Sequence, residues 1–109
     1  MVTVVLKRDK DGMITGFTCS GHANYAEKGA DIICAGISAL THSAVLSLER
    51  LTDLELNIIQ DPEDGWLGCT WVNNVDDERA DLISKVMLIG LEEIERQYPD
   101  YLKVSEVEV

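Results

Sequence analysis

The fold is decided by residues 31–51, which read DIICAGISALTHSAVLSLERL. Aspartate is a favoured helix N-cap, so Asp31 marks the start of a helix. The apolar residues that follow recur every three or four positions, which predicts one helix over 32–51 with a single apolar face. We expect that face to contain Ile33, Ile37, Leu40, Ala44, Leu48 and Leu51.

Upstream of this helix the sequence predicts a β-hairpin and a long loop. Residues 2–8 alternate in polarity and are rich in valine, and residues 13–20 form the second strand. The turn between them contains Gly12, which suits a positive φ. Residues 21–30 contain two glycines and three alanines without a clear period, which is typical of a functional loop.

Downstream the same pattern recurs. Alternation over 54–60 and 66–73 predicts a second hairpin, and a second helix runs from about 76 to 98, where Pro99 stops it. Residues 101–109 alternate again and predict a last strand. We expect much of the apolar face of the second helix to come from Leu82, Val86, Ile89 and Ile94.

The predicted order of elements is therefore β-β-α-β-β-α-β. Two helices can cover one face of a five-stranded mixed sheet, which predicts an α/β (α+β) two-layer sandwich. A chain of 109 residues is long enough for one domain, and no linker or low-complexity segment divides it. We expect residues 1–109 to form that single domain.

The composition narrows the choice of partners and compartment. A formal net charge of -11 argues against direct nucleic-acid binding, which needs a basic face, and is compatible with a basic protein partner. No apolar run approaches the roughly 18 residues that span a bilayer, so we expect no membrane partner. The N-terminus lacks the order of a signal peptide, and three cysteines are an odd set, so we expect a cytoplasmic protein with reduced thiols.

The chemistry centres on Cys34 and on His22, which lies twelve residues earlier. If Asp31 is the N-cap, Cys34 is the third residue of the helix, where the positive end of the helix dipole favours a thiolate. His22 could take the thiol proton as a general base, and backbone N–H groups at the helix start could stabilise an oxyanion. A buried core cysteine and a surface histidine would also fit these residues.

Other polar residues near Cys34 have less certain roles. Asp31 could orient His22, or it could only cap the helix. Ser38 lies one turn beyond Cys34 on the same helix face and could hydrogen-bond within the site, or simply be a small polar residue. His42 lies two turns beyond Cys34, about 12 Å away along the helix, and is expected to be structural. Cys69 is expected to pack in the core.

A zinc site is a weaker alternative. Cys19, His22 and Cys34, with Asp31 as a fourth, are plausible ligands, but structural zinc sites usually show paired, closely spaced ligands. Nucleotide-binding and metalloprotease motifs are absent from the sequence. We therefore predict no metal and no cofactor.

The segments GHA (21–23) and GADIICA (29–35), followed by Ser38, resemble the signature of the ribosomal-processing cysteine protease (Prp) family. The resemblance implies a small bacterial cytoplasmic endopeptidase, usually a homodimer. Its substrate would be the N-terminal extension of ribosomal protein L27, cut after an apolar, aromatic-containing segment and before the basic mature terminus. It also implies that His22 is the base and Cys34 the nucleophile, with Asp31 and Ser38 in support.

The loop that precedes the helix is expected to contact the substrate and to close over it, through Gly21, Ala23, Gly29 and Ala30. Two other functions fit the same residues. A non-catalytic ribosome-associated protein-binding module would have an unreactive Cys34. A thiol redox or metal protein would instead form a reversible disulfide between Cys19 and Cys34, or hold a metal there.

Overall fold

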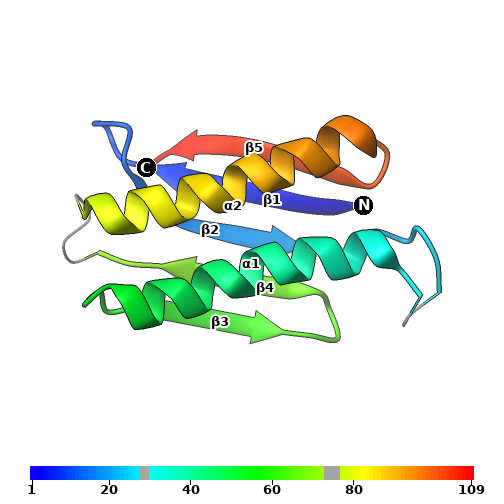
Figure 1. Ribbon diagram of the computed structural model, residues 1–109, viewed down its shortest axis with the longest axis horizontal. Coiled ribbons are helices and arrows are strands. Elements are labelled where there is room, and N and C mark those ends of the chain that lie inside the picture. The colour runs from blue at the N-terminus through cyan, green and yellow to red at the C-terminus, as the bar shows by residue number, and fades with distance from the viewer. Residues whose placement is uncertain (28–29, 73–76) are drawn as a thin grey trace.

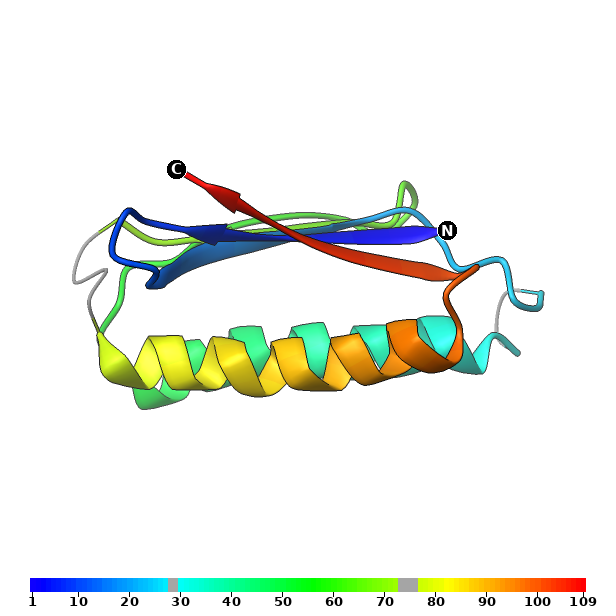
Figure 2. The ribbon, with the colours of Figure 1, turned by 90° about the horizontal axis from the view of Figure 1, so that it is seen from above.

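A mixed sheet and two helices form two layers in the computed structural model, which describes residues 1–27, 30–72 and 77–109. Figure 1 shows both helices lying across the sheet, and Figure 2 shows that they cover the same face of it. The predicted two-layer fold and element order are confirmed. The elements are β1 (Val2–Arg8), β2 (Ile14–Ser20), α1 (Ile32–Leu51), β3 (Asn57–Asp61), β4 (Trp66–Thr70), α2 (Glu78–Gln97) and β5 (Leu102–Glu108).

The strands lie in the order β3-β4-β2-β1-β5. Strand β1 is parallel to β5, and the other neighbouring pairs are antiparallel, so the sheet is mixed as predicted. Strand β3 begins three residues later than predicted, because Leu54 and Leu56 pack against the core without joining the sheet. This order places the β3–β4 hairpin beside β2, on the side of the sheet that α1 covers (Figure 1).

Helix α1 has the predicted bounds and the predicted cap. The backbone N–H of Cys34 donates to Asp31 Oδ1 over 2.9 Å, which is the usual N-cap interaction. Two residues of the expected apolar face differ: Leu51 is exposed in the last turn, and Leu40 is half-buried and faces Gly90 of α2. The side chains that α1 buries are those of Ile33, Ile37, Thr41, Ala44, Val45 and Leu48.

Helix α1 is also long and apolar enough, by length and composition alone, to cross a membrane. The buried face of α1 packs in the core against the sheet and α2.

The predicted apolar face of α2 was wrong. Leu82, Val86 and Ile89 are 64%, 61% and 68% exposed, and of the four expected residues only Ile94 packs against the core. The helix carries apolar residues on two opposite sides, and the core takes the side that periodicity did not favour. The buried residues of α2 are Ala80, Asp81, Ser84, Met87, Leu88 and Leu91.

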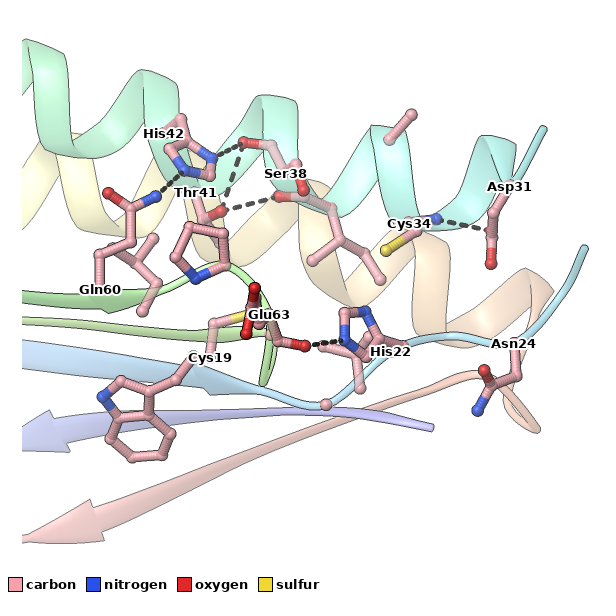
Figure 3. Close-up of a pocket in the computed structure, with 18 of the residues that line it drawn as sticks. Cys19, His22, Asn24, Asp31, Cys34, Ser38, Thr41, His42, Gln60 and Glu63 are labelled. Atoms are coloured by element: carbon pink, nitrogen blue, oxygen red, sulfur yellow. Dashed lines mark hydrogen bonds between the residues drawn. The ribbon is translucent and has the colours of Figure 1, made fainter. Parts of the chain in front are cut away.

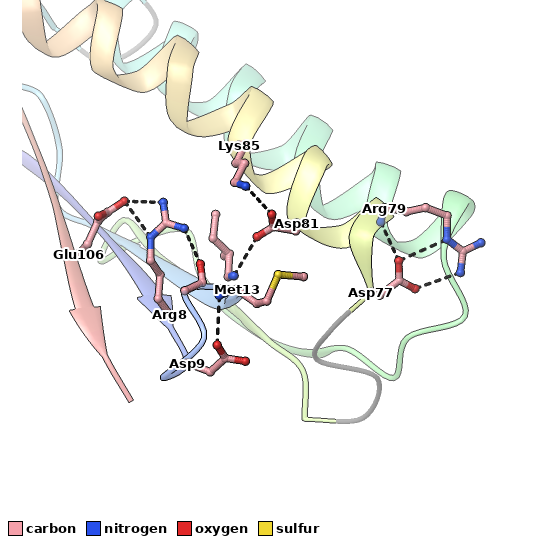
Figure 4. A network of polar contacts seen from close by, with 10 residues as sticks. Arg8, Asp9, Met13, Asp77, Arg79, Asp81, Lys85 and Glu106 are labelled. Atoms are coloured by element: carbon pink, nitrogen blue, oxygen red, sulfur yellow. Dashed lines mark hydrogen bonds and ion pairs between the residues drawn. The ribbon is translucent and has the colours of Figure 1, made fainter.

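A polar network joins the start of α2 to the sheet (Figure 4). The buried carboxylate of Asp81 accepts hydrogen bonds from the Ile14 N–H, over 3.0 Å, and from the Lys85 ammonium, over 2.6 Å. Burial alone would raise the pKa of Asp81, but these two donors outweigh it and hold the pKa below its usual range. An ion pair between Arg8 and Glu106 links β1 to β5 nearby.

Candidate active site

A cleft of about 580 Å³ lies between α1 and the β3–β4 hairpin. One wall is the face of α1 that carries Cys34 and Ser38, and the other is the hairpin turn around Glu63 (Figure 3). Cys19 and His22 from β2 and the loop after it also contribute. The remaining lining side chains that matter here are those of Thr41, His42, Gln60, Pro62, Trp66 and Leu67.

Cys34 occupies the predicted place, as the third residue of α1, and is half-buried. Its side chain and that of His22 reach the same cleft from different elements (Figure 3). Among the described residues, no hydrogen bond joins His22 to Cys34, and such contacts often form only when substrate binds. The structure therefore brings the two predicted catalytic side chains to one site without pairing them.

Asp31 binds backbone groups on two segments. Besides the Cys34 N–H, its carboxylate accepts from the Tyr25 N–H over 3.0 Å, which ties the loop after β2 to the start of α1. Desolvation would raise the pKa of Asp31, but backbone N–H donors, those of Cys34 and Tyr25 first, outweigh it and lower the pKa. The capping role is confirmed.

The backbone N–H of Cys34 is therefore already paired with a carboxylate. The prediction that N–H groups at the start of α1 stabilise an oxyanion stays a prediction, and the Cys34 N–H could contribute only by sharing or leaving its hydrogen bond to Asp31.

His22 is held from the side of the hairpin. Its Nε2 lies 3.2 Å from the backbone carbonyl oxygen of Glu63, which can only accept, so a hydrogen bond between them requires the proton on Nε2. Gly21 gives the chain the sharp turn that places this histidine, since its φ is +90° and a Cβ there would lie 2.5 Å from the Met1 carbonyl oxygen. The sequence had indicated the turn at Gly21 but not the partner of His22.

The other residues of the predicted substrate loop have different places. Ala23 is buried in the core, whereas its neighbours Asn24 and Ala26 line the cleft. Ala30 is exposed, and its N–H donates to the carbonyl oxygen of Glu27 over 2.9 Å. Gly29 lies outside the described residues.

Ser38 and His42 continue the α1 wall of the cleft. The backbone carbonyl of Ser38 accepts a hydrogen bond from Nδ1 of His42 over 2.8 Å, and the amide nitrogen of Gln60 lies 3.1 Å from Nε2 of the same ring. His42 thus bridges α1 to β3 and closes the far part of the cleft (Figure 3). The spacing of two helical turns between Cys34 and His42 could have predicted that both line the same cleft. Nothing in the sequence indicates that Gln60 also lines it.

The three cysteines carry free thiols in different settings. Burial, with a smaller contribution from the neighbouring Cys34, raises the pKa of Cys19 to about 11. Burial, with a smaller contribution from the charge of Glu49, raises the pKa of Cys69 to about 11, and this residue packs in the core as predicted. No three His, Cys, Asp or Glu side chains gather into a metal-binding group within the described part of the chain.

The sequence model of the family described as cysteine protease Prp matches residues 1–103. The ribosomal processing cysteine protease Prp of Bacillus subtilis is 33% identical over 108 residues, which cover 96% of each chain.

Two crystal structures of the essential ribosomal processing protease Prp from S. aureus are also similar. One, with a covalently linked product peptide, is 31% identical with a TM-score of 0.92, and the match covers 98% of this chain and 100% of that one. The other, with a substrate peptide, is 30% identical with a TM-score of 0.86 and the same coverage. The chain therefore belongs to the cysteine protease Prp family.

Proposed function

We propose that this cysteine protease is an endopeptidase that removes the N-terminal extension of ribosomal protein L27, with Cys34 as nucleophile and His22 as general base. The observation that carries the proposal is that both side chains line one cleft, although they come from separate elements. The S. aureus relatives, which bind a substrate peptide and a covalently linked product peptide, support a peptide as the ligand of this cleft.

The reaction follows from these two groups. The Cys34 sulfur attacks the scissile carbonyl carbon, and its proton passes to His22. The tetrahedral intermediate collapses to a thioester as the protonated imidazole gives its proton to the leaving amine. Water, deprotonated by His22, then hydrolyses the thioester and releases the second product. Ser38 lies one helical turn beyond Cys34 on the same wall and is a supporting residue in this scheme.

The surface of the cleft suits a substrate that is apolar before the cut and basic after it. Ile37 and Leu67 are apolar residues among those that line the cleft, which fits an apolar segment. The hairpin turn at its rim carries Asp61, Glu63 and Asp64, all exposed. These carboxylates, with the net charge of -11, attract a lysine-rich terminus toward the site.

The test is to incubate the protein with a peptide spanning the extension and the first mature residues, and to identify the products by mass spectrometry. We expect cleavage at one bond, its loss in Cys34→Ala, and cleavage at the same bond by Cys19→Ser, because Cys19 lines the cleft but is not the nucleophile. An intact peptide, with Cys34 no more reactive than a free thiol, would overturn the proposal and favour a non-catalytic ribosome-associated module.

We further propose that the protein acts as a homodimer in the cytoplasm. The outward side of α2 presents Leu82, Val86 and Ile89, an exposed apolar stripe of the kind that subunit contacts cover. Light scattering after gel filtration is expected to give a dimer for the native chain and a monomer for Val86→Lys. A monomeric native chain at micromolar concentration would contradict this.

A further inference from the structure

The turn of the β3–β4 hairpin is packed directly against the ring of His22. The Glu63 carbonyl oxygen lies 3.2 Å from Nε2, and Gly65 lies against the same edge of the ring. A Cβ on Gly65 would lie 3.0 Å from both Cε1 and Nε2, and 2.5 Å from the Gly21 carbonyl oxygen. A side chain at position 65 would therefore displace the imidazole or the turn itself.

This contact determines which nitrogen of His22 is free. A carbonyl oxygen can only accept, so Nε2 must donate, and the neutral ring then has an unprotonated Nδ1. Figure 3 shows Nε2 of His22 on the side of Glu63, with the opposite edge of the ring facing α1 and Cys34. In the neutral ring of His22, Nδ1 is then the nitrogen that can accept the thiol proton, and it lies on the side of Cys34 (Figure 3).

We propose that Gly65 and the backbone carbonyl of Glu63 are positioning groups that hold His22 as its Nε2–H tautomer, so that Nδ1 receives the proton of Cys34. This inference rests on the proposed roles of His22 and Cys34 and adds the atom that acts and the segment that aims it. It also gives the hairpin turn a part in catalysis, although this turn follows His22 by some forty residues.

His42 provides an internal reference for the tautomer of His22. Nδ1 of His42 faces the Ser38 carbonyl oxygen, so in this ring it is Nδ1 that carries the proton, while Nε2 accepts from the Gln60 amide. The two histidines of the protein should therefore be opposite tautomers. Nitrogen NMR of histidine-labelled protein above the titration range distinguishes them, with His42→Gln used to assign the two rings.

The expected result is the Nε2–H form for His22 and the Nδ1–H form for His42. A neutral His22 that is mainly the Nδ1–H form would overturn the proposal. This measurement needs neither substrate nor activity, so a protein that fails to cleave the peptide refutes the proposed function without deciding the tautomer.

A matched pair of glycine variants tests the positioning role. Gly65 has φ +65° and Gly12, in the β1–β2 turn, has φ +82°, so alanine is strained at both positions. At Gly12, however, a Cβ would meet nothing within 4 Å. Both variants thus share the strain of a positive φ, and only Gly65→Ala also presses on the His22 ring and on the Gly21 carbonyl group that precedes it.

We expect Gly65→Ala to lower kcat on the order of tenfold or more, because a misaligned or wrong tautomer of the base impairs proton transfer. Its KM should stay within about twofold, and the pH profile of Cys34 alkylation should shift. Gly12→Ala should keep kcat, KM and that profile. Equal kcat values in the two variants would overturn the positioning role, and if Gly65→Ala does not fold, the tautomer of the native protein decides.

Discussion

Helices α1 and α2 have the same length and the same kind of start, yet within residues 1–27, 30–72 and 77–109 only the start of α1 lines the cleft described above. Each runs for 20 residues after an aspartate N-cap. In α1 the third residue is Cys34, which opens into the cleft, whereas in α2 it is Ala80, which is fully buried. An aspartate cap is therefore no sign of function by itself, and what matters is what the third residue faces.

The two caps also bind different groups. Asp77 accepts from the N–H groups of Arg79 and Ala80, and the Arg79 guanidinium closes onto it over 3.0 Å, so this cap serves its own helix. Asp31 instead reaches the backbone of Tyr25, in the loop that carries His22. The start of α1 is thus coupled to the loop that carries His22, whereas the described contacts of the start of α2 are local or reach the sheet.

The largest expected effect concerns His22. Replacing it by alanine should lower kcat by about 10²–10⁴-fold, the usual contribution of a general base, while the melting temperature changes little. His42→Ala should instead raise KM with kcat largely kept, because His42 lies two turns farther along α1. Steady-state kinetics on the extension peptide checks both, and an equal loss of kcat in the two variants would contradict the assignment.

The second comparison is among the thiols. A pKa of about 11, against an ordinary 9.0, means that near pH 8 the thiolate fraction of Cys19 and of Cys69 is about a hundredfold smaller than that of an ordinary cysteine. We expect iodoacetamide to modify Cys34 at least tenfold faster than either of them, with loss of activity following the modification of Cys34. Peptide mapping by mass spectrometry gives the three rates, and faster labelling of Cys19 would shift the nucleophile to β2.

The caps themselves provide the third test. Asp31→Ala and Asp77→Ala should each lower the melting temperature by a few degrees through loss of a helix cap. Only Asp31→Ala should also lower kcat/KM, several-fold, because the loop after β2 loses its attachment to α1. Calorimetry and kinetics on both variants decide, and an equal effect on activity would show that the caps are equivalent.

The smallest effect belongs to Asp81. Its pKa is lowered in the folded protein, so the ionised carboxylate stabilises the fold above the unfolded value of about 3.9, and that stability is lost as the pH falls through the folded pKa. Asp81→Asn keeps an acceptor for Ile14 but loses the charge that pairs with Lys85. We expect its free energy of unfolding at pH 7 to fall by about 1 kcal/mol or less and its acid sensitivity to weaken, without change in kcat. Urea titrations at pH 7 and pH 3 measure this, and a larger loss at pH 3 would contradict it.

The fold could be predicted because its signals are local. Asp31 and the spacing of Ile33, Ile37 and Leu48 define α1 without reference to the rest of the chain. The face of α2 could not be chosen in this way, because the helix has two apolar sides and only the packing of the sheet and α1 against it selects one of them. Periodicity identifies a helix better than it identifies the direction in which the helix faces.

The candidate site was predictable only in part, for a similar reason. His22 and Cys34 lie close enough in sequence to suggest a pair, and Gly21 and Asp31 mark the turns around them. Gly65 looks like an ordinary turn glycine, and the contact it makes with His22 depends on β4 lying next to β2. Residues whose role depends on strand order are the ones that a single sequence does not disclose.

The parallel pairing of β1 with β5 has a consequence for how the protein is made. Val2 pairs with Leu102 and Arg8 with Glu108, so β1, the second strand in from one edge of the sheet, pairs with a strand about one hundred residues later in the sequence. Contacts this distant in sequence slow folding, because a long loop must close before they form. We expect β1 to keep this edge unpaired in a nascent chain until β5 has been synthesised. Refolding of the protein in microseconds would contradict the slow folding that this pairing predicts.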